Sequence, residues 1–230
     1  MKRAIGNLFI VFGLISVIGA GGLFLYNYLD AKRAADASAE ILRKLDEEMA
    51  KDNGTDEDQD PVDEIISDEA RAKYTQKAMP TETIDGQRYI GKLEIPSLGL
   101  TLPVMENWDY ERLKISPCRY SGSYYYDDLV ICAHNYARHF SPIKWIGIGV
   151  EVNFINVKDE VYRYKTSNIE TVDPVSVDDM IKNTHNDKKS KKDWDMTLFT
   201  CNTGGQTRCA VRCVRVDRDQ ASSDSSGSGS

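Results

Sequence analysis

The sequence predicts an all-β domain with a few short helices, arranged as a closed β-barrel and preceded by a transmembrane helix and an acidic linker. Two observations lead to this fold class. From about residue 87 onward, short runs of alternating or buried-type apolar residues follow one another with few helical repeats between them. Near the N-terminus, a single long apolar segment precedes a strongly acidic stretch. The 230 residues suffice for one such domain with its anchor and linker.

The apolar segment covers residues 8–25, where Ser16 is the only polar side chain. A run of about 18 residues is close to the lower limit for a membrane-spanning helix. Lys2 and Arg3 precede it and favour a cytoplasmic N-terminus. A cleaved signal peptide is the alternative, but the run is longer than a usual signal core and no clear Ala-X-Ala site follows. We therefore expect residues 1–29 to be a single-pass anchor in the cell membrane, with the remainder of the chain on the extracellular face.

Residues 30–86 are predicted to form an acidic linker. Between residues 30 and 69 there are 15 acidic side chains against five basic ones. Residues 34–51 have a helical composition, with apolar side chains at Ile41, Leu42, Leu45 and Met49 that share one face. Residues 52–60 are polar and are expected to be mobile, and a second short helix is predicted over 61–79. The simplest interpretation is a stalk that holds the folded domain away from the membrane.

The folded domain is predicted to span residues 87–219, and the Ser/Gly-rich tail 220–230 is expected to be disordered. Short helices are expected at 107–114 and 177–183. Strands are expected at 89–96, 98–104, 128–133, 149–154, 160–164, 169–172, 195–201 and 207–216.

Charge and motif content exclude several classes of function. The net charge is −7, but the acidity lies in the linker and the rest of the chain is slightly basic. Lysines between residues 182 and 192 form the one dense basic run, and no aromatic residues interleave it, so we expect no nucleic-acid partner. The chain has no Cys-X-X-Cys or His-X-X-X-His pattern. We accordingly predict no metal and no cofactor.

Three residues have the chemistry of a cysteine-dependent acyl transfer. Cys201 ends one predicted strand, His134 ends another, and Arg208 begins the strand that follows Cys201 across a Gly-Gly turn. A free thiol is mostly unreactive at neutral pH and needs a base or a nearby cation to become a nucleophile. On the strand expected at 207–216, the alternation predicts that Cys209, Val211 and Cys213 face the core, while Arg208 and Arg212 share the opposite face. Arg212 is the fallback, because it lies one repeat further from Cys201.

The segment Thr197-Leu198-Phe199-Thr200-Cys201, with Ala133-His134 upstream and Arg208 downstream, resembles the sortase family over about residues 89–217. The resemblance implies an eight-stranded closed barrel. It also implies that His134, Cys201 and Arg208 are catalytic, and that Thr200 and Leu198 contribute to substrate binding.

The same resemblance implies a membrane-anchored transpeptidase. Such an enzyme cleaves an LPXTG-like sorting signal near the C-terminus of a secreted protein and retains the protein as a thioacyl intermediate. An amine of a peptidoglycan precursor, or a pilin lysine, then releases it. The Asn after Ala133-His134 is similar to class B sortases, but the segment from Val172 to Leu198 is short for the helix of that class, so the subclass is class B-like or unassigned. A lid over the site is a further alternative, although Val62 follows Asp60-Pro61 where pilus-building sortases have an aromatic residue.

Two other functions remain open from the residues alone. The barrel would be a non-catalytic module that binds sorting peptides if its three site residues were inactive. Alternatively, Cys118 or Cys132 would form a reversible disulfide with Cys201 in a surface thiol-redox protein.

Overall fold

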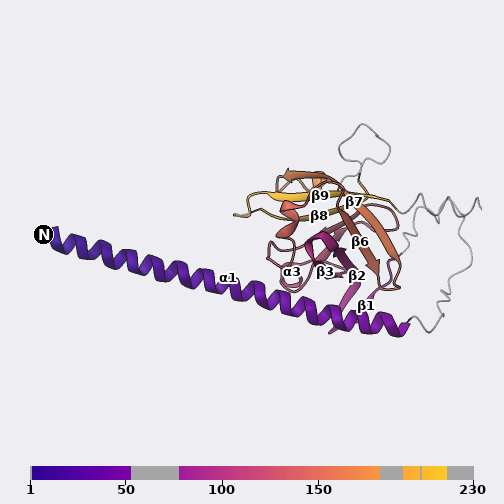
Figure 1. The fold of residues 1–230 in the computed structure, drawn as a ribbon, viewed down its shortest axis with the longest axis horizontal. Coiled ribbons are helices and arrows are strands. Elements are labelled where there is room, and N and C mark those ends of the chain that lie inside the picture. Colours follow the sequence, from indigo (N-terminus) through magenta and orange to yellow (C-terminus); the bar gives the residue numbers. More distant parts are fainter. Residues whose placement is uncertain (1, 53–77, 182–193, 203, 217–230) are drawn as a thin grey trace, which may run out of the picture.

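A computed structural model describes residues 2–52, 78–181, 194–202 and 204–216 (Figure 1). Within these residues the sheet order is β1-β2-β3-β4-β5-β8-β9-β7-β6, and β6 also pairs with β2. The β2–β6 pairing closes a ring of eight strands, while β1 pairs with β2 alone. The prediction of an eight-stranded closed barrel with short helices is therefore confirmed.

The strands are β1 (Glu82–Ile84), β2 (Gln87–Ile95), β3 (Leu100–Met105), β4 (Cys118–Ser121), β5 (Leu129–Cys132), β6 (Glu151–Asn156), β7 (Val161–Val172), β8 (Met196–Cys201) and β9 (Arg208–Arg215). The helices are α1 (Lys2–Asp52), α3 (Tyr110–Leu113) and α4 (Val177–Ile181), with 3-10 turns η1 (Pro96–Leu98) and η2 (Pro142–Trp145).

The observed elements differ from the predicted ones at three places. The strands expected at 160–164 and 169–172 are one strand, β7, with a bulge between Thr166 and Asn168 that interrupts the alternation of side chains. Strands β1 and β4 were not predicted, because three and four residues are too few to show a period. Helix α3 is shorter than predicted; it begins where the Asp109 side chain accepts a hydrogen bond from the Arg112 amide at 2.7 Å. The second linker helix expected at 61–79 and the lysine-rich run lie almost entirely outside the described residues.

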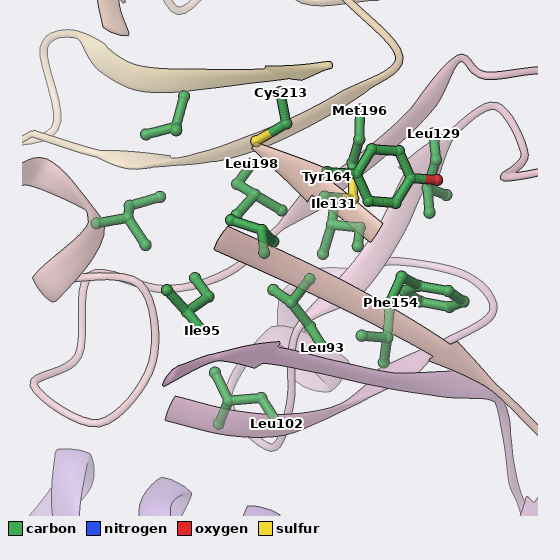
Figure 2. Packing of buried hydrophobic residues seen from close by; sticks show 14 of the residues in the cluster. Leu93, Ile95, Leu102, Leu129, Ile131, Phe154, Tyr164, Met196, Leu198 and Cys213 are labelled. Atoms are coloured by element: carbon green, nitrogen blue, oxygen red, sulfur yellow. The ribbon is translucent and has the colours of Figure 1, made fainter. Parts of the chain in front are cut away.

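The inward faces of the strands fill the barrel with apolar side chains from strands far apart in the sequence (Figure 2). Leu93 of β2, Ile131 of β5, Phe154 of β6 and Leu198 of β8 are all essentially inaccessible to solvent. Cys209, Val211 and Cys213 of β9 belong to the same core, as the strand alternation predicted. The barrel is thus solid, and its chemistry is confined to its outer surface and rim.

Barrel closure depends on a close backbone approach at Gly91. This residue has φ +147°, and a Cβ placed on it would lie 2.0 Å from the carbonyl oxygen of Ile155 on β6. Only glycine combines this conformation with that contact. Gly91 thereby allows β2 to bulge against β3 and still pair with β6.

Helix α1 is continuous from the apolar segment into the predicted linker (Figure 1). Its first half is long and apolar enough to cross a membrane, and its described apolar side chains are exposed. Its second half is not a free stalk. Ile41, Leu45 and Met49 are buried against the outer face of the barrel, in a cluster that includes Tyr89 and Met105. The apolar face predicted for residues 34–51 is therefore covered by the barrel.

Polar contacts fix the position of α1 along the barrel. Lys92 donates to Asp46 at 2.7 Å, and Lys44 donates to Asp85 at the same distance. Nearer the membrane segment, Ser38 donates to the carbonyl of Ile115 at 2.6 Å. These contacts define one register between the helix and the strands.

We predict that Leu45→Ala undocks α1 locally and leaves the barrel folded. Leu45 is fully buried between the helix and the strands, and truncation of such a leucine costs about 2–4 kcal/mol. Amide hydrogen exchange over residues 34–49 of the detergent-solubilised protein should therefore accelerate more than tenfold. The control Glu47→Ala removes an exposed side chain of the same helix and should leave exchange unchanged. Equal acceleration in the barrel strands would contradict a local docking role.

Candidate active site

The pairing of three neighbouring strands brings His134, Cys201 and Arg208 together. Strands β5 and β8 run parallel, with Cys132 opposite Phe199. Two further bonds continue this register: the Ala133 amide donates to the Phe199 carbonyl at 3.2 Å, and the Thr200 hydroxyl donates to the Ala133 carbonyl at 2.9 Å. His134 and Cys201 follow at the ends of these two strands, whose backbones lie about 4.8 Å apart.

Strand β9 supplies the arginine from the other side of β8. In the antiparallel β8–β9 pair, Arg208 is the direct partner of Cys201. The two side chains therefore occupy one face of the sheet at the same level. The cysteine lies between a histidine on one neighbouring strand and an arginine on the other.

A pocket of about 180 Å³ opens at this point and is lined by all three residues. Trp108, Tyr120 and Phe199 form an aromatic side of the pocket, with ring centroids 5.2 Å apart for both Trp108–Tyr120 and Tyr120–Phe199. Val177 and Met180, on α4, line the pocket as well. The pocket thus combines the Cys201 thiol with apolar surface suited to a peptide side chain.

The environment of His134 favours a neutral imidazole. The side chain is partly buried, and this burial lowers its pKa from the ordinary value of 6.5. Asp30 of α1 acts in the opposite direction and raises the pKa, whereas Lys114 lowers it. A neutral imidazole beside Cys201 is able to accept the proton of the thiol.

The two arginines of β9 have different surroundings. Arg208 is partly exposed and donates to the carbonyl oxygens of Gly205 and Thr207 in the β8–β9 turn, at 2.9 and 3.3 Å. Among the described residues, no carboxylate forms a salt bridge with it. Its charge is therefore available at the pocket.

Arg212 is 1% exposed and fully engaged. It pairs with Glu170 at 2.6 Å, and donates to the Thr197 hydroxyl and to the Met180 carbonyl at 2.8 and 2.9 Å. These bonds attach α4 to the outer face of the sheet. The alternative assignment of Arg212 as the site arginine has no support from this geometry, since the side chain instead holds one wall of the pocket.

The two residues expected to contact the substrate are placed differently. Thr200 is among the pocket-lining residues, but it is 1% exposed and its hydroxyl is used to bind the Ala133 carbonyl. That bond positions the backbone next to His134. Leu198 points into the barrel core and is fully buried. It offers no surface to a substrate, so the expectation of direct contact needs correction, and Phe199 faces the pocket in its place.

The other cysteines are buried and free. Cys118 and Cys132 are direct partners across β4 and β5. Burial raises the pKa of Cys118 to about 12 and raises that of Cys132 well above its usual value. Both are poor nucleophiles in this environment, and the thiol-redox alternative gains no support.

Sequence reasoning missed the aromatic side of the pocket. Trp108 and Tyr110 flank the start of α3, and Tyr120 lies on the unpredicted strand β4. Their proximity to Cys201 depends on the parallel β3–β4 and β5–β8 pairings, which no local pattern encodes. Among the residues described, no group of three or more potential metal ligands is present.

Comparisons with known proteins agree with this arrangement. The model of the sortase domain matches residues 93–216, more than half of the chain. No curated protein sequence matches the chain. Among solved structures, the sortase D5 transpeptidase of Clostridium perfringens aligns at 16% identity with a TM-score of 0.52, covering 79% of this chain and 99% of that one. A mutant of sortase C-1 from S. pneumoniae aligns at 19% identity with a TM-score of 0.51, covering 77% and 97%.

At these identities the two structures bear on the fold alone, and the assignment to a class B-like or unassigned subclass stays a prediction. The domain match, the closed barrel and the meeting of cysteine, histidine and arginine at one pocket lead to one conclusion: this chain belongs to the sortase family.

Proposed function

We propose that this protein is a cysteine transpeptidase that cleaves an LPXTG-like sorting signal and transfers the secreted protein to an amine at the cell surface. The observation that carries this proposal is the placement of Cys201 between His134 and Arg208 at an apolar pocket. Cys201 is the nucleophile, His134 the proton carrier and Arg208 the cationic donor.

In the first half-reaction, the Cys201 sulfur attacks the carbonyl of the scissile amide while His134 takes the thiol proton. The carbon–sulfur bond forms, and the carbon–nitrogen bond then breaks as His134 gives the proton to the leaving amine. Arg208 faces the same pocket with its fixed fork of N–H donors, which suits the anionic tetrahedral intermediate.

In the second half-reaction, an incoming amine loses a proton to His134 and attacks the thioester. A new amide forms and the Cys201 thiol is regenerated. The acceptor belongs to a peptidoglycan precursor or is a pilin lysine. The long apolar half of α1 supports membrane anchorage. Lys2 and Arg3, which precede the apolar segment, favour the extracellular face for the barrel, where both substrates occur.

The first prediction concerns the covalent intermediate. Incubation of the protein with LPXTG-like peptides should give a thioacyl adduct on Cys201 that is detectable by mass spectrometry and is resolved by a small amine. Cys201→Ala should give no adduct, because the thiol is the nucleophile. Cys132→Ala is the matched control, since Cys132 lines the same pocket, and it should retain the adduct. An adduct that persists in Cys201→Ala, or that requires Cys132, would refute the mechanism.

The second prediction concerns pH. His134 has a pKa lowered from 6.5 by burial, so its imidazole is neutral at pH 7 and becomes protonated only as the pH falls below 6.5. The rate of adduct formation should therefore be maintained at neutral pH and decline at acidic pH, where His134 no longer accepts the thiol proton. His134→Asn should lower the rate about 10²–10⁴-fold. A rate that increases as the pH falls through this range would contradict His134 as a base.

The third prediction concerns Arg208. Arg208→Ala should lower kcat about 10²–10³-fold with the pocket intact, the usual effect of removing a donor to an oxyanion. Arg208→Lys keeps the charge without the fork and should recover part of the loss. Arg163→Ala, an exposed arginine on β7, serves as the control with unchanged kinetics. Wild-type kcat in Arg208→Ala would remove Arg208 from the mechanism.

A further inference from the structure

Helix α1 reaches the segment that follows the site histidine. The hydroxyl of Tyr136 donates to the Asp30 carboxylate of α1 at 2.6 Å, and the Tyr136 ring lies against the His134 ring with centroids 5.0 Å apart. Asp30 is one residue beyond the predicted anchor. Asp30, just after the apolar segment of α1, is thus connected to His134 through the ring of Tyr136.

A second contact fixes the same segment to α1. His139 is fully buried, and its Nε2 atom is 3.1 Å from the Ser38 hydroxyl. Burial lowers the pKa of His139 to about 4, so its imidazole is neutral at neutral pH. Ser38 lies eight residues after Asp30, about 12 Å farther along the helix. Two points on α1 therefore hold the segment from Tyr136 to His139.

The backbone of this segment connects Tyr136 with His134. The His139 amide donates to the Tyr136 carbonyl at 3.0 Å, and the Phe140 amide donates to the His134 carbonyl at 3.3 Å. The segment is a closed turn, and His134 begins it. Its orientation is set on one side by β5 and on the other by the two contacts with α1.

Tyr136 is the donor in this contact and the Asp30 carboxylate the acceptor. Burial and the bond to Asp30 raise the pKa of Tyr136, so the phenol remains a donor. A phenol that donates to a carboxylate forms a charge-assisted bond, which is stronger than a neutral one. The charged groups that act on His134 are Asp30 and Lys114, with Arg208 lining the same pocket.

We propose that Asp30 and Tyr136 are positioning residues for His134, so that the active site is complete only when α1 is docked on the barrel. This inference rests on the proposed transpeptidase function. It adds Asp30, which lies outside the matched sortase domain, to the residues that support catalysis. It assigns α1 a part in catalysis in addition to anchorage. A barrel prepared without α1 lacks the acceptor for Tyr136 and retains a less ordered His134.

The test uses the full chain in detergent micelles and measures thioacyl formation at Cys201. Asp30→Ala and Tyr136→Phe should each lower kcat about tenfold, the scale expected when a catalytic group is misplaced by a fraction of an ångström, with KM unchanged. The double variant should show the loss of either single variant, because both remove one bond. Asp30→Asn, which retains an acceptor without the charge, should be intermediate.

Asp46→Ala is the matched control, since Asp46 also joins α1 to the barrel, through Lys92 at 2.7 Å, but far from the site. It should leave kcat unchanged. Rates within twofold of wild type for Asp30→Ala and Tyr136→Phe, additive losses in the double variant, or an equal loss in Asp46→Ala would each overturn the proposal.

A readout without turnover separates this proposal from the transpeptidase function. In NMR titrations, the pKa of His134 should fall in Asp30→Ala, because a carboxylate that stabilises the imidazolium is removed, and should stay constant in Asp46→Ala. If wild type forms no adduct while this shift is seen, the proposed reaction fails and the positioning contact stands. An unchanged His134 pKa in Asp30→Ala, with normal adduct formation in wild type, would reject the positioning role alone.

Discussion

The parallel pairing of β5 with β8 is the constraint on which the site depends. It joins two segments separated by 67 positions, and it places the residues that follow Cys132 and Phe199 side by side. The Thr200–Ala133 bond extends this pairing by one residue beyond the last regular pair. A parallel pair requires a long connection. Here the connection between β5 and β8 contains β6 and β7, so His134 and Cys201 are neighbours only when these strands have taken their places in the barrel.

Around this pair, the outer face of the sheet is covered in two directions. On one side, Arg212 attaches α4 to β7, β8 and β9 through bonds to Glu170, Thr197 and Met180. On the other side, α1 covers the barrel and its apolar cluster continues through Leu113 to Tyr120 and Phe199. The pocket lies between α4 and the side of the sheet that carries Tyr120 and Phe199. The bonds of Arg212 and the apolar cluster under α1 therefore support the pocket walls without involving Cys201 or His134.

Helix α1 is continuous from the apolar segment to the residues that contact the barrel. A stalk that merely spaced the barrel from a membrane would need no defined register with it. Here the register is fixed by apolar burial at Leu45 and by polar contacts from Asp30 to Asp46. The apolar segment and the residues that contact the barrel belong to one continuous helix. The helix that contains the apolar segment thus also contacts the residues next to His134.

Much of the fold and the core of the site were predictable from the sequence. Alternating apolar residues identified most strands of the barrel, and the segment around Cys201, with His134 and Arg208, identified the family and supplied the candidate site residues, since these features are encoded locally. The strand phase also placed Cys209, Val211 and Cys213 in the core. Arg208 and Arg212, however, share one strand face, and only their surroundings separate an available cation from a buried structural one.

Only the tertiary structure decided what depends on contacts between distant segments. Leu198 and Thr200 are buried because they lie on the inward face of β8, where Leu198 joins the barrel core and the Thr200 hydroxyl donates to the Ala133 carbonyl of the neighbouring chain segment. The aromatic wall formed by Trp108, Tyr120 and Phe199 and the docking of α1 arise from pairings between residues far apart in the chain. Sequence periodicity reports which face of an element is apolar, but it does not identify the partner that covers that face. For this protein the sequence determined the family and the candidate site residues, and the long-range packing determined the surroundings of those residues.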